Sequence, residues 1–202
     1  MIAPTDITLG LLAGGRATRL GGLDKAWLTR GGMSQVERWR RRFSAETATV
    51  LVSANREPER YERIGLRAVP DRTSADLGPL AGLDALAAAC GTSWLLTLPV
   101  DLVGVNDCLV PGLSAAADPY GAYAVDDDGP QPLVALWPTA PLRDATVRAI
   151  QARDLAIHSL QRHLRMAAVR MDGVRFGNLN TPHDLAIAGA VPGNPDGHGT
   201  LA

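Results

Sequence analysis

Lysine is nearly absent from this 202-residue chain, which has one lysine beside nineteen arginines. The one lysine, Lys25, closes the glycine-rich segment "LAGGRATRLGGLDK" that begins at Leu12. Its ammonium group is a compact point charge, whereas a guanidinium group is a planar fork, so the two contact phosphates differently. We therefore expect Lys25 to place its charge on a phosphate. The alternative is that a codon bias toward arginine left a single lysine by drift.

Cysteine, long apolar segments and excess charge are also scarce. The two cysteines, Cys90 and Cys108, form no CxxC pair and lie apart from clustered histidines, which disfavours a metal or redox role for them. No apolar run approaches the roughly 20 residues of a membrane span, and the N-terminal pattern is not that of a signal peptide. A net charge of −1 gives no electrostatic reason to bind nucleic acid or a membrane surface. We expect a cytoplasmic protein that binds neither.

What the chain does contain is an alternation of short apolar runs and helical segments. Four runs predict strands: Ile7 to Leu12, "ATVLVSAN", "LRAVPD" and "SWLLTLPVD". They are apolar throughout rather than at every second residue, as in parallel strands that are buried on both faces. The sequence therefore predicts a single doubly wound α/β domain, with a mostly parallel sheet and helices on both faces.

The second half of the chain predicts fewer regular elements. The segment "GAYAVDDDGPQPLVALWP" is typical of two strands joined by an acidic turn, which we place antiparallel at a sheet edge. Two helices and a strand from Met166 to Arg170 follow, and then a helix capped by Thr181 with Pro182 in its first turn. From Gly189 onward, glycine and proline dominate. We predict a domain over residues 1–188 and a disordered tail over 189–202.

Polar or glycine residues follow each of the four apolar strands. Gly14 and Gly15 come after the first strand, Asn55 ends the second, Asp71 the third and Asp101 the fourth. Asparagine and aspartate are also common in turns for local reasons. In an open parallel sheet, however, ligands bind at the carboxyl ends of the strands. Four such ends in succession predict one polar crevice.

The residue types indicate a nucleoside triphosphate as the occupant of this crevice. Glycines let backbone N–H groups approach an anion, and Arg16, Arg19 and Lys25 add positive charge for a polyphosphate. Asp101 offers the hard oxygen ligands that Mg²⁺ uses together with phosphates. The segment lacks the glycine that precedes the lysine of a P-loop, and no GxGxxG follows the first strand. Both common phosphate-binding motifs are therefore disfavoured.

The segment "LAGGRATRLGGLDKAWL" is similar to the signature loop of the molybdenum cofactor guanylyltransferases, which belong to a larger nucleotidyltransferase family with a nucleotide-binding, Rossmann-like α/β fold. Further segments follow in that family's order as far as about Ala188: "SANR", "YERIGLRAVPD", "GPLAG", "PVD", "PLVALWP" and "FGNLNTPHDL". The first loop alone is shared with many sugar-nucleotide enzymes. Its combination with "GPLAG" and "NLNTP" is much more specific.

The resemblance implies Mg²⁺-dependent transfer of GMP from GTP to the terminal phosphate of Mo-molybdopterin, which gives the guanine dinucleotide cofactor and pyrophosphate. Its GTP contacts would be Leu12, Ala13, Gly14, Gly15, Lys25, Asn55, Asp71, Gly78, Leu80 and Asp101. Its catalytic residues would be Lys25, Arg19 and Asp101, and Asp101 would also bind the metal. Asn178 and Asn180 would lie on the pterin side, or they simply begin a capped helix. Protein partners would be cofactor-delivery proteins or molybdoenzyme chaperones.

Three departures from the family pattern keep other interpretations open. "PVDLVG" lacks the usual cysteine before the aspartate and the Thr-Pro after it, Ser53 replaces a common asparagine, and "ARDLAIHSL" keeps Arg153 without a second arginine. Cytidylyl transfer, or transfer to another phosphorylated acceptor such as a sugar phosphate, is the alternative enzyme. A catalytically silent binding module is the third interpretation. The presence of both Lys25 and Asp101 disfavours it.

Overall fold

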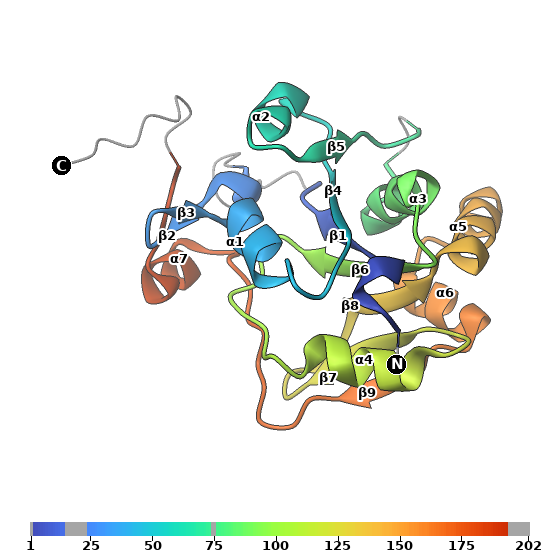
Figure 1. The fold of residues 1–202 in the computed structure, drawn as a ribbon. Coiled ribbons are helices and arrows are strands. Elements are labelled where there is room, and N and C mark those ends of the chain that lie inside the picture. Colours follow the sequence, from blue (N-terminus) through green and yellow to red (C-terminus); the bar gives the residue numbers. More distant parts are fainter. Residues whose placement is uncertain (1, 15–23, 74–75, 194–202) are drawn as a thin grey trace.

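A computed structural model describes residues 2–14, 24–73 and 76–193 (Figure 1). The strands are β1 (Ile7–Leu12), β2 (Thr29–Arg30), β3 (Met33–Ser34), β4 (Thr49–Ser53), β5 (Arg67–Val69), β6 (Trp94–Pro99), β7 (Ala122–Asp126), β8 (Gly129–Pro138), β9 (Ala167–Arg170) and β10 (Ala190–Val191). The α-helices are α1 (Gln35–Arg42), α2 (Pro58–Arg63), α3 (Pro79–Ala89), α4 (Leu109–Ala117), α5 (Thr139–Ala152), α6 (Ile157–Leu164) and α7 (Pro182–Ala188). Short 3₁₀ helices are η1 (Pro4–Asp6) and η3 (Lys25–Trp27).

The central sheet has seven strands in the order β5-β4-β1-β6-β8-β7-β9. The first four strands of this order are mutually parallel, β8 runs antiparallel to both β6 and β7, and β9 is parallel to β7. The antiparallel β7–β8 pair is as predicted, but its placement at the sheet edge is wrong. The last five residues of β8 are buried, which suits an interior strand, and β9 forms the edge beyond β7.

Helices cover both faces of this sheet, which confirms the predicted doubly wound architecture (Figure 1). Strand β6 shows the division: Leu96 and Leu98 pack in the cluster that includes α1 and α4, whereas Leu95 packs in the cluster that includes α3, α5 and α6. Successive side chains of a strand point to opposite faces, so an uninterrupted apolar run builds two cores at once.

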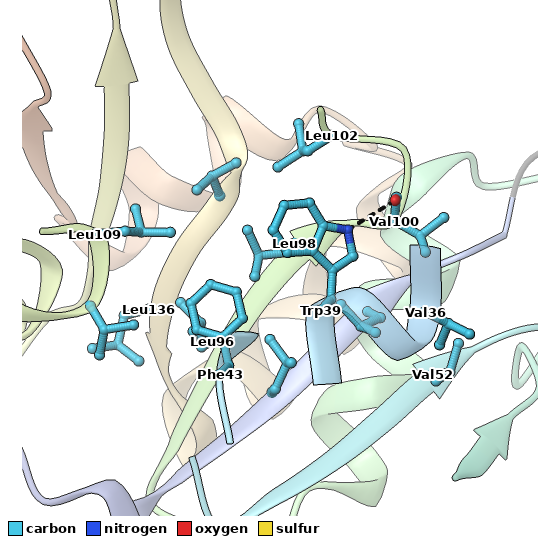
Figure 2. Close-up of a cluster of buried hydrophobic side chains, with 14 of the residues drawn as sticks. Val36, Trp39, Phe43, Val52, Leu96, Leu98, Val100, Leu102, Leu109 and Leu136 are labelled. Atoms are coloured by element: carbon cyan, nitrogen blue, oxygen red, sulfur yellow. Dashed lines mark hydrogen bonds between the residues drawn. The ribbon is translucent and has the colours of Figure 1, made fainter. Parts of the chain in front are cut away.

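Helix α1 is fixed at its start by a capping box and along its length by aromatic packing. The Ser34 side chain accepts a hydrogen bond from the Glu37 backbone N–H, and the Glu37 side chain accepts one from the Ser34 N–H. Figure 2 shows Trp39 of this helix, and Phe43 just after its end, among the leucines of β6, with the Trp39 indole donating to the Val100 carbonyl at 3.0 Å. The helix is thereby held beside the carboxyl end of β6.

Helix α3 approaches the carboxyl end of β4 closely. Gly78 precedes the helix with φ of 57°, a conformation that favours glycine, and Pro79 occupies the first turn. A side chain at Gly82 would place its Cβ 2.5 Å from the Ser53 hydroxyl oxygen, so only glycine permits this contact. The N-terminus of α3 therefore opens at the same edge of the sheet as the loops after β1 and β4.

The C-terminal segment differs from the prediction at its start. Helix α7 has the expected cap, with Thr181 and Asp184 forming a capping box. Ala190 and Val191, which the sequence places in a disordered tail, instead form β10 and pair antiparallel with β2 in a second, three-stranded sheet. Ala190 is buried in a small cluster with Leu28 and Leu185, and this burial holds the strand. Residues 194–202 lie outside the described part. Among the described residues, no helix combines the length and apolar character needed to cross a membrane.

Candidate active site

One cleft of about 1210 Å³ lies at the carboxyl ends of the parallel strands. Its lining residues are Leu12, Ala13, Gly14, Asp24, Lys25, Ser53, Ala54, Asn55, Arg56, Asp71, Arg72, Thr73, Asp76, Leu77, Gly78, Pro79, Ala81, Gly82, Pro99, Val100, Asp101 and Leu133. The structure thus brings together residues from all four predicted strand ends. Backbone hydrogen bonds continue the ladder there, from Ala13 N–H to Ser53 carbonyl and from Val100 N–H to Leu12 carbonyl, both at 3.1 Å.

Lys25 and Asp101 line one end of the cleft, and Lys25 also contacts Asn180, which is not itself a lining residue. The Lys25 ammonium group donates to Asp101 Oδ2 at 2.6 Å and to Asn180 Oδ1 at 2.5 Å. The Lys25 and Asp101 side chains are each 19% exposed, so this ion pair is shielded but reachable from the cleft. We call these three residues the charged cluster.

Three separate segments build the charged cluster. Lys25 begins η3, whose start is capped by the Asp24 carboxylate accepting from the Ala26 N–H at 3.0 Å. Asp101 follows β6, and its carbonyl accepts from the Leu179 N–H at 2.8 Å. An antiparallel bridge between Leu102 and Asn178 holds the same two segments together. These backbone contacts place Asn180 beside Lys25, although the two residues are 155 positions apart in the sequence.

The opposite end of the cleft is formed by Asn55 and Asp71. The Asn55 amide donates to Asp71 Oδ2 at 2.8 Å, and its carbonyl oxygen accepts from the Asp71 backbone N–H, also at 2.8 Å. This reciprocal pair ties the end of β4 to the end of β5. This end of the cleft therefore presents an amide and a carboxylate that are bonded to each other, and neither member of the pair is a cation.

Three predicted contacts within the described residues do not line the cleft. The Leu80 side chain is 1% exposed and packs in the core under α3, so it does not line the cleft, although Gly78 does. Asn178 pairs with Leu102 through the backbone bridge and is also absent from the lining. Asn180 is absent from it as well, although its side chain contacts Lys25. The predicted contacts Gly15 and Arg19 lie outside the described residues, as does Arg16.

Several lining residues were not singled out from the sequence. Asp24 is one: burial raises its pKa above the ordinary range, against the lowering effect of its hydrogen bond from Ala26. Its place just before Lys25 was the available signal. Arg72 is another, and its contact with Asp84 joins residues that no local pattern links. Ser53, which the sequence marked only as a departure from the family pattern, also lines the cleft, and its buried hydroxyl has no hydrogen-bond partner within the described part of the chain.

The donor set at the charged cluster is one carboxylate and one amide oxygen. Both are hard oxygen ligands of the kind that Mg²⁺ accepts when phosphates and water complete its coordination. Within the described ranges, no group of three or more histidine, cysteine, aspartate or glutamate side chains could hold a metal ion alone. The cluster therefore suits a cation that is shared with a bound phosphate.

Comparison with known proteins agrees with this geometry. Residues 10–169 match the family described as the MobA-like NTP transferase domain. The chain belongs to this family. A molybdenum cofactor guanylyltransferase of Cupriavidus pinatubonensis is 34% identical over 194 residues, covering 92% of this chain and 97% of the relative. One from Cereibacter sphaeroides is 38% identical over 185 residues, covering 88% of this chain and 93% of the relative.

Solved structures share the fold of this MobA-like NTP transferase. Molybdopterin-guanine dinucleotide biosynthesis protein A from Archaeoglobus fulgidus has a TM-score of 0.66 at 21% identity, covering 90% of this chain and 96% of that one. 2-C-methyl-D-erythritol 4-phosphate cytidylyltransferase from Thermus thermophilus has a TM-score of 0.63 at 20% identity, covering 89% and 95%. The predicted family, nucleotidyltransferase fold and enzyme class are confirmed, while the individual site roles stay predictions.

Proposed function

We propose that this protein transfers GMP from GTP to the terminal phosphate of Mo-molybdopterin, forming molybdopterin guanine dinucleotide and pyrophosphate. The observation that carries the proposal is that Lys25 and Asp101 line the same cleft as the Asn55–Asp71 pair. Relatives named molybdenum cofactor guanylyltransferase, which match along nearly their whole length, support it.

The reaction joins two anions, and this sets what the residues must do. An oxygen of the acceptor phosphate forms a bond to the α-phosphorus of GTP, and the bond from that phosphorus to the bridging oxygen breaks to release pyrophosphate. Coulomb repulsion opposes the approach, so positioning and charge neutralisation carry most of the catalysis. The Lys25 ammonium group supplies positive charge to the phosphates, and no general base is required.

Mg²⁺ is the cofactor that this cluster suits. The Asp101 carboxylate would hold it, with the Asn180 amide oxygen beside that carboxylate on Lys25. When bound, the cation supplies further neutralisation of phosphate charge. The Asn55–Asp71 pair then offers hydrogen bonds to the nucleoside. Asn178 and Asn180 were predicted on the pterin side, and the Lys25 contact supports a place for Asn180 beside the phosphates instead.

Pyrophosphate release tests the proposal directly. The protein is incubated with Mo-molybdopterin, Mg²⁺ and one nucleoside triphosphate at a time. We expect release with GTP and little with CTP, ATP or UTP. Equal release with CTP would contradict the guanine assignment, and no release with any nucleotide would contradict the transfer reaction. Cofactor-delivery proteins or molybdoenzyme chaperones as partners, and a cytoplasmic location, remain predictions from the sequence.

A further inference from the structure

Helix α3 carries a buried carboxylate that the proposed reaction does not use. The helix sequence "PLAGLDALAAA" is otherwise apolar, yet Asp84 in its middle is only 5% exposed. Removing a carboxylate from water costs free energy unless ionic or hydrogen-bonding partners compensate. The partners of Asp84 therefore indicate what the residue contributes.

One partner of Asp84 lies in the core and the other lies at the rim of the cleft. The Thr146 hydroxyl of α5, which is fully buried, donates to Asp84 Oδ1 at 2.8 Å. Arg72 Nη1 contacts both carboxylate oxygens at 3.3 Å. The Arg72 side chain is 54% exposed and lines the cleft. A buried, threonine-supported carboxylate thus holds an arginine at the mouth of the nucleotide site.

The Arg72 guanidinium group keeps donors for a ligand. Its hydrogen bonds to Asp84 come from Nη1, and in the described part of the chain Nε and Nη2 donate to no protein acceptor. A guanidinium group presents its N–H donors as a planar fork, which matches two adjacent acceptor atoms in one plane.

The position of Arg72 across the sheet indicates which part of a nucleotide it meets. Arg72 follows β5, whereas Asp101 follows β6, and β4 and β1 lie between these strands. Three strand spacings separate the two strand ends by about 14 Å. With the phosphates at the charged cluster, the base extends toward the end formed by Asp71 and Arg72.

We infer that Arg72 is a specificity-determining residue that donates to O6 and N7 of the guanine base, and that Asp84 and Thr146 position it. These two acceptors suit the guanidinium fork, whereas adenine presents an amino donor in place of O6, and cytosine has no N7. The inference rests on the proposed function, because it takes GTP as the nucleotide.

The test is nucleotide binding by calorimetry in the presence of Mg²⁺, with GTP and with 7-deaza-GTP, which lacks the N7 acceptor. The wild-type protein should bind GTP about tenfold more tightly than 7-deaza-GTP. Arg72→Ala removes both contacts, so it should weaken GTP binding by about 30-fold and bring the two affinities together. Arg67→Ala is the matched control, because Arg67 is an exposed arginine of β5 outside the cleft lining, and it should behave as wild type.

Asp84→Asn tests the positioning role separately, because Arg72 remains present. Its affinity ratio between GTP and 7-deaza-GTP should fall toward that of Arg72→Ala, and Thr146→Val should move it in the same direction by less. Thermal unfolding of each variant shows whether it is folded. A lowered midpoint with an unchanged ratio would make Asp84 merely structural and overturn its role.

The remaining outcomes separate the inference from the proposed function. If wild type binds GTP but Arg72→Ala weakens GTP and 7-deaza-GTP equally, Arg72 contacts the phosphates or supports the fold, and the inference is wrong. An unchanged ratio in Arg72→Ala overturns it as well. If the wild-type protein binds no GTP, the proposed function itself fails, and the inference fails with it.

Discussion

Two carboxylates at strand ends on opposite halves of the sheet have opposite surroundings. Asp101, after β6 in the parallel half, contacts the Lys25 ammonium group and lines the cleft. Asp126, at the end of β7 in the other half, is fully buried and accepts from the Phe176 N–H and from the side chain of Gln131, each at 3.0 Å. A carboxylate after a strand is therefore identified as functional or structural by its partners, and not by its position.

The largest expected effect is at Asp101, the carboxylate that we propose holds the metal. Asp101→Asn removes the charge that would hold the metal, so we expect kcat to fall by about 10²-fold or more with little change in stability. Pyrophosphate release with GTP and Mo-molybdopterin is the measurement. Asp107→Asn is the control, since Asp107 is 97% exposed and pairs with Arg42 away from the cleft. Equal rates for Asp101→Asn and wild type would remove Asp101 from the mechanism.

The structural carboxylate should respond in the opposite way. Asp126→Asn leaves buried N–H donors with a poorer acceptor, and we expect a loss of about 2 kcal/mol in the free energy of unfolding. The rate of pyrophosphate release should stay near wild type at a temperature where the variant is folded. Urea denaturation measures the first quantity. A stable variant with impaired turnover would reverse the comparison.

The destabilisation caused by Asp126→Asn should depend on pH, which further tests the structural role of Asp126. Burial opposes ionisation of Asp126, but hydrogen bonds from Phe176, Gln131 and Asp128 outweigh it and lower its pKa. A lowered pKa in the folded state stabilises the protein above the unfolded pKa of about 3.9, and this stabilisation is lost as pH falls through the folded value. The stability difference between wild type and Asp126→Asn should therefore shrink below about pH 4. A difference that is constant from pH 7 to pH 3 would contradict the assignment.

Exchanging the lone lysine for arginine has a smaller expected effect. Lys25→Arg keeps the positive charge but replaces a point charge by a planar fork between Asp101 and Asn180. We expect kcat/KM for GTP to fall by about tenfold, as measured in the same pyrophosphate assay. A wild-type value would favour drift as the explanation for the single lysine.

The smallest effect is expected at the other end of the cleft. Asn55→Ala removes two hydrogen bonds to Asp71, but both groups are exposed to water, which replaces the lost bonds in part. We expect KM for GTP to rise about fivefold with kcat nearly unchanged. A fall in kcat as large as that of Asp101→Asn would show that the two ends do not differ in role.

The parallel half of the fold was predictable because its signals are local. Each of its strands is an apolar run that is followed by Gly14, Asn55, Asp71 or Asp101. A run that is apolar throughout predicts a strand that is buried on both faces of the sheet. The interior position of β8 was not predictable, since the sequence of an antiparallel pair does not show which of its strands pairs with β6, or that β9 covers the other. The two-residue β10 gives too short a signal to separate from a loop.

The residues of the candidate site also fall into two groups, those with a local sequence signal and those without one. Its strand-end residues follow from local patterns, but the contact of Asn180 with Lys25 depends on packing between segments 155 residues apart. The Arg72–Asp84 contact likewise joins a loop to a buried helical position, and a lone aspartate in an alanine-rich helix has no sequence signature of its own. Non-local contacts of this kind require the three-dimensional structure.

A crystal structure with Mg²⁺ and a GTP analogue whose α,β-bridging oxygen is replaced by methylene tests the central claim most directly. We expect the triphosphate to lie on Lys25 and Asp101, with the guanine base toward Asp71 and Arg72. A triphosphate bound away from Lys25 and Asp101, or a base at their end of the cleft, would contradict it.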